Sequence, residues 1–238
     1  MKQKEAKVYQ HGTLGMLVPG LFNGTLSVAE LLEHGDHGIG TASGLDGEMI
    51  LLAGTPYLVQ STGRVRILEQ SEKVPFATVH FAQKKDTFEG EALDKKAFEQ
   101  AVLAKYPYKN LFFAVTATGR FKQVKTRAVA KQEPPYPPLT AVAAAQTVFE
   151  KQNVTGTLLG YYAPGLFDGM AVAGYHLHFL DDAKSFGGHV LDFELASGKI
   201  SVEPFATVEQ HFPLQDESFL AEQIESASLH AQLKQAEG

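Results

Sequence analysis

The chain has 238 residues and a formal net charge of −6, with 44% hydrophobic and 20% charged residues. This composition is typical of a globular protein, and no basic run interleaved with aromatic residues indicates a nucleic-acid surface. The absence of cysteine excludes disulfides, thiolate zinc sites and cysteine nucleophiles, which leaves histidine and carboxylate as strong metal ligands.

The N-terminal segment Met1–Lys7 is charged, and no apolar signal core follows it. No stretch reaches the roughly 18 apolar residues that a membrane helix needs. We therefore expect a cytoplasmic protein with neither a membrane nor a nucleic acid as partner.

Short elements joined by glycine turns are predicted in the first half of the chain. A helix over Leu26–Glu33 begins at Ser27, whose hydroxyl suits an N-cap, and a second helix covers about Asp94–Lys105. Leu111–Thr118 and Arg120–Val129 would pair as a hairpin through Gly119. Further strands are expected at Glu48–Ala53, Thr55–Gln60 and Arg64–Glu69.

Residues 133–138 include four prolines, which cannot continue a helix or an inner strand, so this segment predicts a stiff linker. After it we expect a helix over Leu139–Gln152, a hairpin of His189–Leu195 with Lys199–Val202, and a final helix over Asp216–Ala236. Strands outnumber helices, and short turns join many of them. This pattern favours an α+β fold with mostly antiparallel or mixed sheets and flanking helices.

Two motifs occur twice in the chain, in the same order. Pro19–Gly24 recurs as Pro164–Gly169, and Pro75–Val79 recurs as Pro204–Val208. These matches indicate an internal duplication with loops of different length. We therefore expect two similar α+β lobes, with the C-terminal one carrying the histidines described next. The expected boundaries are residues 1–132 and 139–238, with the linker at 133–138.

Three histidines form the most informative pattern. His176 and His178 are two positions apart, so an extended strand projects both from one face. A turn at Gly187 and Gly188 can return the chain and bring His189 beside them. Three neutral imidazoles on rigid strands, with one position open, match a catalytic zinc site. A pair of histidines on a strand also occurs without any metal, and the residues alone leave both interpretations open.

Two charged residues are candidates of a weaker kind. Glu48 opens an apolar strand. A carboxylate at this position is often simply exposed to solvent, but next to a cation it could ligate a metal or transfer a proton. Arg127 precedes the proline linker and, taken alone, is typical of a surface residue.

Six motifs occur in order over almost the whole chain: Gly12–Gly15, Leu45–Glu48, Pro75–Val79, Pro134–Pro137, Gly174–His178 and Gly187–His189. Together they resemble the α-acetolactate decarboxylase family. The resemblance implies a two-lobed α+β lyase that converts (S)-2-acetolactate to (R)-acetoin and carbon dioxide, in acetoin and 2,3-butanediol biosynthesis.

The resemblance also implies a cofactor, Zn²⁺, with His176, His178 and His189 as its ligands. In the mechanism that this implies, zinc chelates the hydroxyl and ketone of the substrate. The electrons left by carbon dioxide then flow into the polarised carbonyl, giving a metal-stabilised enediolate.

Four more roles follow from the resemblance. Glu48 matches a catalytic glutamate, and Arg127 matches an arginine that is both catalytic and substrate-binding. Glu237 is the best match for a C-terminal glutamate that reaches the metal region, and Thr41 is expected to line the substrate pocket. The family also implies a homodimer.

Two alternatives remain from the residues themselves. A cupin-like metal-dependent oxygenase or isomerase would also use two alternating histidines and a later one. The glutamate expected soon after that pair is missing, and Asp181 and Asp182 stand in that region. A non-catalytic metal-stabilised binding protein would bind a ligand without releasing carbon dioxide.

Overall fold

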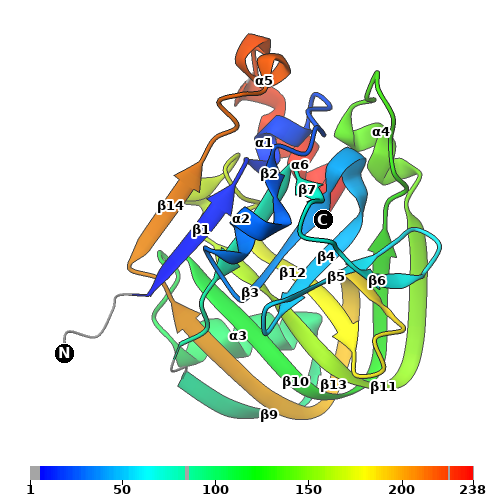
Figure 1. Ribbon diagram of the computed structural model, residues 1–238. Coiled ribbons are helices and arrows are strands. Elements are labelled where there is room, and N and C mark those ends of the chain that lie inside the picture. Colours follow the sequence, from blue (N-terminus) through cyan, green and yellow to red (C-terminus); the bar gives the residue numbers. More distant parts are fainter. Residues whose placement is uncertain (1–5, 84–85, 225, 238) are drawn as a thin grey trace.

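The computed structural model describes residues 6–83, 86–224 and 226–237. Two β-sheets of mixed and antiparallel strands face each other across the molecule, with short helices around them (Figure 1). This arrangement confirms the predicted α+β class. No helix in the described part of the chain is long and apolar enough to span a membrane.

The first sheet has seven strands within the described residues, and all its neighbouring strands are antiparallel except β1 and β14. In spatial order the strands are β14 (Thr207–His211), β1 (Lys7–His11), β8 (Phe76–His80), β3 (His37–Ala42), β4 (Asp46–Leu52), β5 (Thr55–Val59) and β6 (Val65–Ile67). A separate short pair joins β2 (Leu26–Ser27) to β7 (Lys73–Val74).

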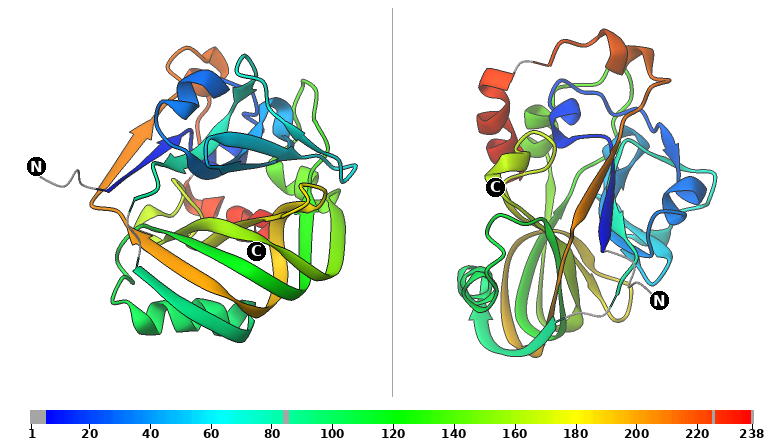
Figure 2. Two further views of the ribbon diagram at one scale, coloured as in Figure 1. Left: turned by 60° about the horizontal axis from the view of Figure 1, so that its bottom comes forward. Right: turned by 90° about the vertical axis from the view of Figure 1, so that its left-hand side faces the viewer.

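The second sheet is antiparallel and strongly curled (Figure 2). Its order is β10 (Phe113–Ala128), β11 (Thr147–Ala163), β12 (Gly174–Asp181), β13 (Gly187–Pro204) and β9 (Asp86–Asp94). Strand β10 also pairs with β13, so that β10 to β13 form a closed circuit of neighbours.

The helices are short, and side-chain caps start the best defined of them. In α2 (Val28–Leu32), Ser27 and Glu30 form a reciprocal capping box, and α3 (Lys95–Lys105) begins at the Asp94 side chain. Both helices lie where the sequence predicts them. The remaining helical segments are α1 (Leu14–Leu17), α4 (Leu139–Ala144), α5 (Glu217–Ala221), α6 (Ser226–Glu237) and the 3₁₀ turns η1 (Ser43–Leu45) and η2 (Gly165–Phe167).

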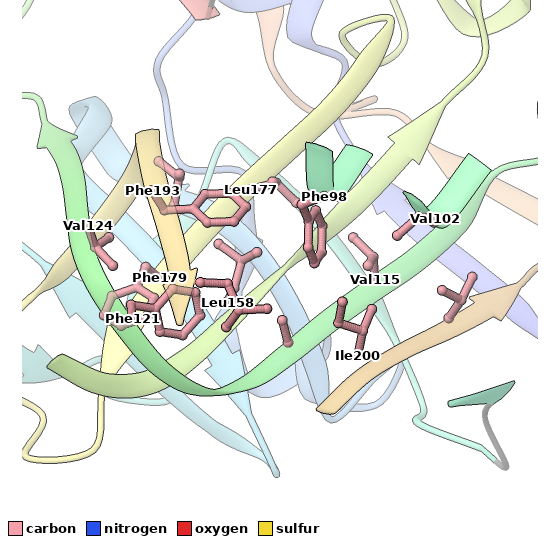
Figure 3. Close-up of a cluster of buried hydrophobic side chains, with 14 of the residues drawn as sticks. Phe98, Val102, Val115, Phe121, Val124, Leu158, Leu177, Phe179, Phe193 and Ile200 are labelled. Carbon is pink, nitrogen blue, oxygen red and sulfur yellow. The ribbon is translucent and has the colours of Figure 1, made fainter. Parts of the chain in front are cut away.

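Strand alternation divides the core into layers. Val8 and Ile50 face the space between the sheets, whereas their neighbours Tyr9 and Met49 face the outer side of the first sheet, under α2. On the other sheet, α3 covers the concave apolar surface with Phe98 and Val102 (Figure 3). A fourth cluster, built largely from α1, α4 and α6, closes one end of the molecule. The space between the sheets at this end is where the candidate site lies.

Two predicted breaks in the second sheet are wrong. Gly119 and Gly198, expected as hairpin turns, lie inside the continuous strands β10 and β13. They sit opposite each other in one cross-strand row with Gly156 of β11 and Gly90 of β9. A Cβ on Gly119 would lie 2.3 Å from the Ser197 carbonyl oxygen. Glycine here permits close approach of curled strands and does not mark a turn.

The helix predicted over Leu139–Gln152 ends early, because α4 stops at Ala144 and β11 begins at Thr147. Threonine, valine and phenylalanine at 147–149 favour the strand. The predicted C-terminal helix is two helices, because α5 ends at Ala221 and α6 begins at Ser226.

The predicted duplication into two similar lobes is not confirmed. The two sheets differ in strand number and connection, and they do not follow the boundary expected at residues 133–138. Strands β9 and β10 precede that segment and pair with β11 or β13, which follow it. Strand β14 returns to pair with β1. The chain therefore crosses between the sheets in both directions.

Candidate metal centre and active site

Three histidines from two neighbouring strands meet on one face of the second sheet. His176 and His178 alternate along β12, and His189 of β13 lies directly opposite His178 in the ladder. Their candidate ligand nitrogens all lie within 4.8 Å of one another. The ring centroids are 5.0 to 5.5 Å apart. We call these three residues the histidine triad.

Two rings of the triad, those of His176 and His189, have the protonation state that a bound cation needs. Burial, followed by the nearby Arg127 charge, lowers the pKa of His176 to about 3. The same two causes, in the same order, hold the pKa of His189 well below its usual range. Both rings are therefore neutral near pH 7 and keep a lone pair for a metal.

A backbone carbonyl of the first sheet orients the third ring. His178 Nδ1 lies 3.0 Å from the Met49 carbonyl oxygen, which can only accept, so Nδ1 carries the proton. The lone pair of Nε2 is then directed to the opposite side, where the Glu48 carboxylate lies 3.6 Å away. This is the pattern in which an outer hydrogen bond fixes the tautomer of a metal-bound histidine. The donor set therefore fits a divalent cation.

Glu48 and Arg127 face each other from different sheets. Glu48 on β4 is 7% exposed and Arg127 on β10 is 5% exposed, and Arg127 Nη1 lies 3.7 Å from Glu48 Oε1. Arg127 is also opposite His189 in the β10–β13 ladder. The carboxylate and the guanidinium therefore meet at the interface of the two sheets.

A tight turn presents Glu48 to the site. Gly47 has φ +75°, and a Cβ there would lie 2.3 Å from the Val59 carbonyl oxygen, so only glycine fits. The Thr41 hydroxyl donates to the Gly47 carbonyl oxygen at 2.7 Å. Thr41 therefore braces the turn that positions Glu48.

A pocket joins these groups. Thr41, Glu48, Arg127, His176 and His178 make its polar side. Its apolar side comes mainly from α1, η1 and α4, and none of its side chains was predicted to line the site. These residues are Leu14, Leu17, Leu45, Phe76, Val129 and Leu139.

Glu237 is the last residue of α6, and its side chain lies outside the described residues. Its neighbour Ala236 lines a second pocket together with Arg127, Thr140 and Leu191. The end of α6 therefore lies beside the arginine of the site.

Comparisons with known proteins agree with this geometry. Residues 8–226 match the family model of alpha-acetolactate decarboxylase. The chain is 39% identical to the alpha-acetolactate decarboxylase of Streptococcus thermophilus, over 97% of this chain and 98% of that protein. The match to the enzyme of the same name from Brevibacillus brevis is also 39% identical, over 88% of this chain and 74% of that protein. The crystal structure of alpha-acetolactate decarboxylase from Bacillus subtilis strain 168 superposes with a TM-score of 0.95 at 32% identity, covering 98% of this chain and 99% of that one.

Proposed function

We propose that this chain, which belongs to the alpha-acetolactate decarboxylase family, converts (S)-2-acetolactate to (R)-acetoin and carbon dioxide. The observation that carries the proposal is one pocket in which neutral imidazoles, a carboxylate and a guanidinium converge from two sheets. A small anionic hydroxyketone needs one group of each kind. The imidazoles would hold a metal ion for its hydroxyl and ketone oxygens, the guanidinium would bind its carboxylate, and the carboxylate of the site would transfer the proton.

The histidine triad would hold the metal, which we propose to be Zn²⁺. When bound, the cation supplies Lewis acidity to the adjacent hydroxyl and ketone oxygens of the substrate. The triad supports this assignment because the three rings are close together, His176 and His189 are neutral, and three protein ligands leave room for a substrate.

Arg127 would bind the substrate carboxylate. Its guanidinium is nearly buried in the pocket wall, where a charge-assisted, bidentate hydrogen bond is stronger than in water. Holding the carboxylate there would orient the bond to be broken relative to the triad. After carbon dioxide leaves, the same donors can stabilise a developing oxyanion.

Glu48 would relay the proton that replaces carbon dioxide, because its carboxylate can take up a proton from solvent and pass it to the substrate carbon. Its carboxylate lies between Arg127 and His178, and the braced turn at Gly47 holds it there. A donor fixed on one wall protonates one face of the planar carbon, which sets the chirality of the product. Glu237, at the end of α6, is the second candidate for this step.

One assay tests the proposal against both alternatives. Racemic 2-acetolactate is added to protein loaded with Zn²⁺ and to chelator-treated protein, and acetoin, carbon dioxide and oxygen are measured. We expect acetoin and carbon dioxide from the loaded protein, loss of both after chelation, and recovery on adding Zn²⁺. Oxygen consumption would instead support a cupin-like oxygenase, and binding without carbon dioxide release would support a binding protein.

We further propose a cytoplasmic location and a homodimer, which remain predictions from the sequence. Light scattering of the purified protein tests the second, because a monomeric mass of 25.9 kDa would contradict it.

A further inference from the structure

A buried polar bridge joins the two sheets beside the pocket. His80 of β8 is 0% exposed and Tyr161 of β11 is 3% exposed, and His80 Nδ1 lies 2.8 Å from the Tyr161 hydroxyl oxygen. On the other side of the ring, His80 Nε2 lies 3.8 Å from a carboxylate oxygen of Glu203, at the end of β13. The bridge therefore links one strand of the first sheet to two strands of the second.

The surroundings of this bridge are mostly apolar and aromatic. The His80 ring packs edge-on against Phe205, with centroids 5.2 Å apart, and Tyr161 packs edge-on against Phe112 at 5.9 Å. Polar groups lose hydration in such a place, whereas apolar side chains would fill it at lower cost. A hydrogen bond differs from apolar packing in having a defined length and direction. The bridge therefore fixes how β11 lies relative to β8.

Strand β11 carries this constraint to the histidine triad. Tyr161 is opposite His176 in the β11–β12 ladder. Opposite residues of antiparallel strands project to the same face, with Cβ atoms about 4.5–5.5 Å apart. Tyr161 is thus the lateral neighbour of one triad residue. His178, in contrast, is held to the first sheet directly through the Met49 carbonyl.

We propose that Tyr161 and His80 are positioning residues for the metal centre. Their hydrogen bond, braced by Glu203, sets the place of His176 relative to the first sheet, which carries Glu48. This inference rests on the proposed metal site. Removing a group that orients a metal ligand typically weakens metal binding by about 10–100-fold. This bridge acts on His176 through its neighbour Tyr161 on the adjacent strand, so we expect the smaller effect, a decrease in metal affinity of about 10-fold.

Two tyrosine variants form a matched test. Tyr162 adjoins Tyr161 but faces the other side of β11, where its hydroxyl donates to the Lys109 carbonyl at 3.2 Å. Tyr161→Phe and Tyr162→Phe each remove one phenolic oxygen. Zn²⁺ affinity is measured by competition with a chromophoric chelator, and the Co²⁺-loaded proteins are compared by their visible spectra.

We expect Tyr161→Phe to bind Zn²⁺ about 10-fold more weakly and to show a shifted Co²⁺ spectrum. Tyr162→Phe should match the wild type in both. A Tyr161→Phe protein with wild-type affinity and spectrum overturns the proposal. A wild-type protein that binds no metal contradicts the proposed function itself, so the two failures are distinguishable.

A second pair probes the bridge from His80 and decides the question if Tyr161→Phe does not fold. Asparagine places its amide near the position of Nδ1, which faces Tyr161, whereas glutamine places its amide near that of Nε2, which faces Glu203. We therefore expect weaker Zn²⁺ binding in His80→Gln than in His80→Asn. Equal affinities, or the reverse order, overturn the proposal.

Discussion

Glu48 and Arg127 meet across the interface of the two sheets, with Oε1 and Nη1 3.7 Å apart in the wall of the pocket. Neither residue is adjacent to the other in sequence or in any strand ladder, so their contact depends on how the sheets pack. The guanidinium lines the pocket, where its planar set of donors suits an anion bound there. A substrate carboxylate is the anion expected there.

Replacing Glu48 with glutamine tests its role as proton donor. The amide keeps nearly the same shape but cannot deliver the proton, so kcat should fall by about 10²–10⁴-fold. The triad is intact in this variant, and bound Zn²⁺ should stay stoichiometric by elemental analysis. Acetoin formation at saturating 2-acetolactate gives kcat. A variant with wild-type kcat would move the proton transfer to another group.

Arg127→Lys tests carboxylate binding while keeping a positive charge beside Glu48. Lysine lacks the planar fork of donors, and a charge-assisted hydrogen bond contributes about 1.5–3 kcal/mol, so kcat/KM should fall by about 10–100-fold. Chelator competition should show unchanged Zn²⁺ affinity. The expected loss is specific to substrates with a carboxylate. Equal kcat/KM in the variant and the wild type would show that the arginine does not bind this group.

The sequence predicts the local parts of the site well and its assembly poorly. Alternation along one strand brings His176 and His178 to the same face, and the chain returns as predicted to bring His189 beside them. The return is made by residues 182–186, however, whereas Gly187 and Gly188, predicted as the turn, lie inside β13. Ser27 starts α2 through a contact three residues away. Each of these relations depends on residues that are close in the chain, which is why patterns in the chain reveal them.

The errors arise where one local signal has two meanings. Gly119 and Gly198 are typical of turns, yet both serve a row of glycines along which four strands curl closely together. Which meaning holds depends on partner strands far away in sequence. The apolar wall of the pocket was not predicted for a different reason. Leu14 and Leu139 come from helices too short to show a clear period.

His178→Ala should remove the metal along with the activity. Alanine deletes both the ligand nitrogen and the contact with the Met49 carbonyl, so stoichiometric Zn²⁺ and acetoin formation should both be lost. The control is His230→Ala, because His230 is an exposed residue that pairs with Asp168 at 2.6 Å outside the triad. It should retain both metal and activity. Retained metal in His178→Ala would contradict the assignment of the triad.

The buried His11 should make the protein less stable in acid. Burial, followed by the neighbouring His211, lowers its pKa from 6.5 to about 4. Its ring is wedged between His211 Nδ1 and the Thr25 hydroxyl, both at 2.8 Å. As the pH falls below about 6.5, the unfolded chain takes up a proton that the folded chain does not, and stability declines until about pH 4. The full effect of this one group is up to about 3 kcal/mol.

His11→Asn removes that titration and should give a shallower decline in stability between pH 6.5 and 4. Urea unfolding of chelator-treated wild type and variant at pH 7 and pH 4.5 measures it, with metal removed so that protonation of the triad does not release a bound ion. The variant is expected to be less stable at pH 7, because it loses buried contacts, but to lose less stability on acidification. The same loss in both proteins would show that His11 does not control acid stability, and the decline would then belong to other groups.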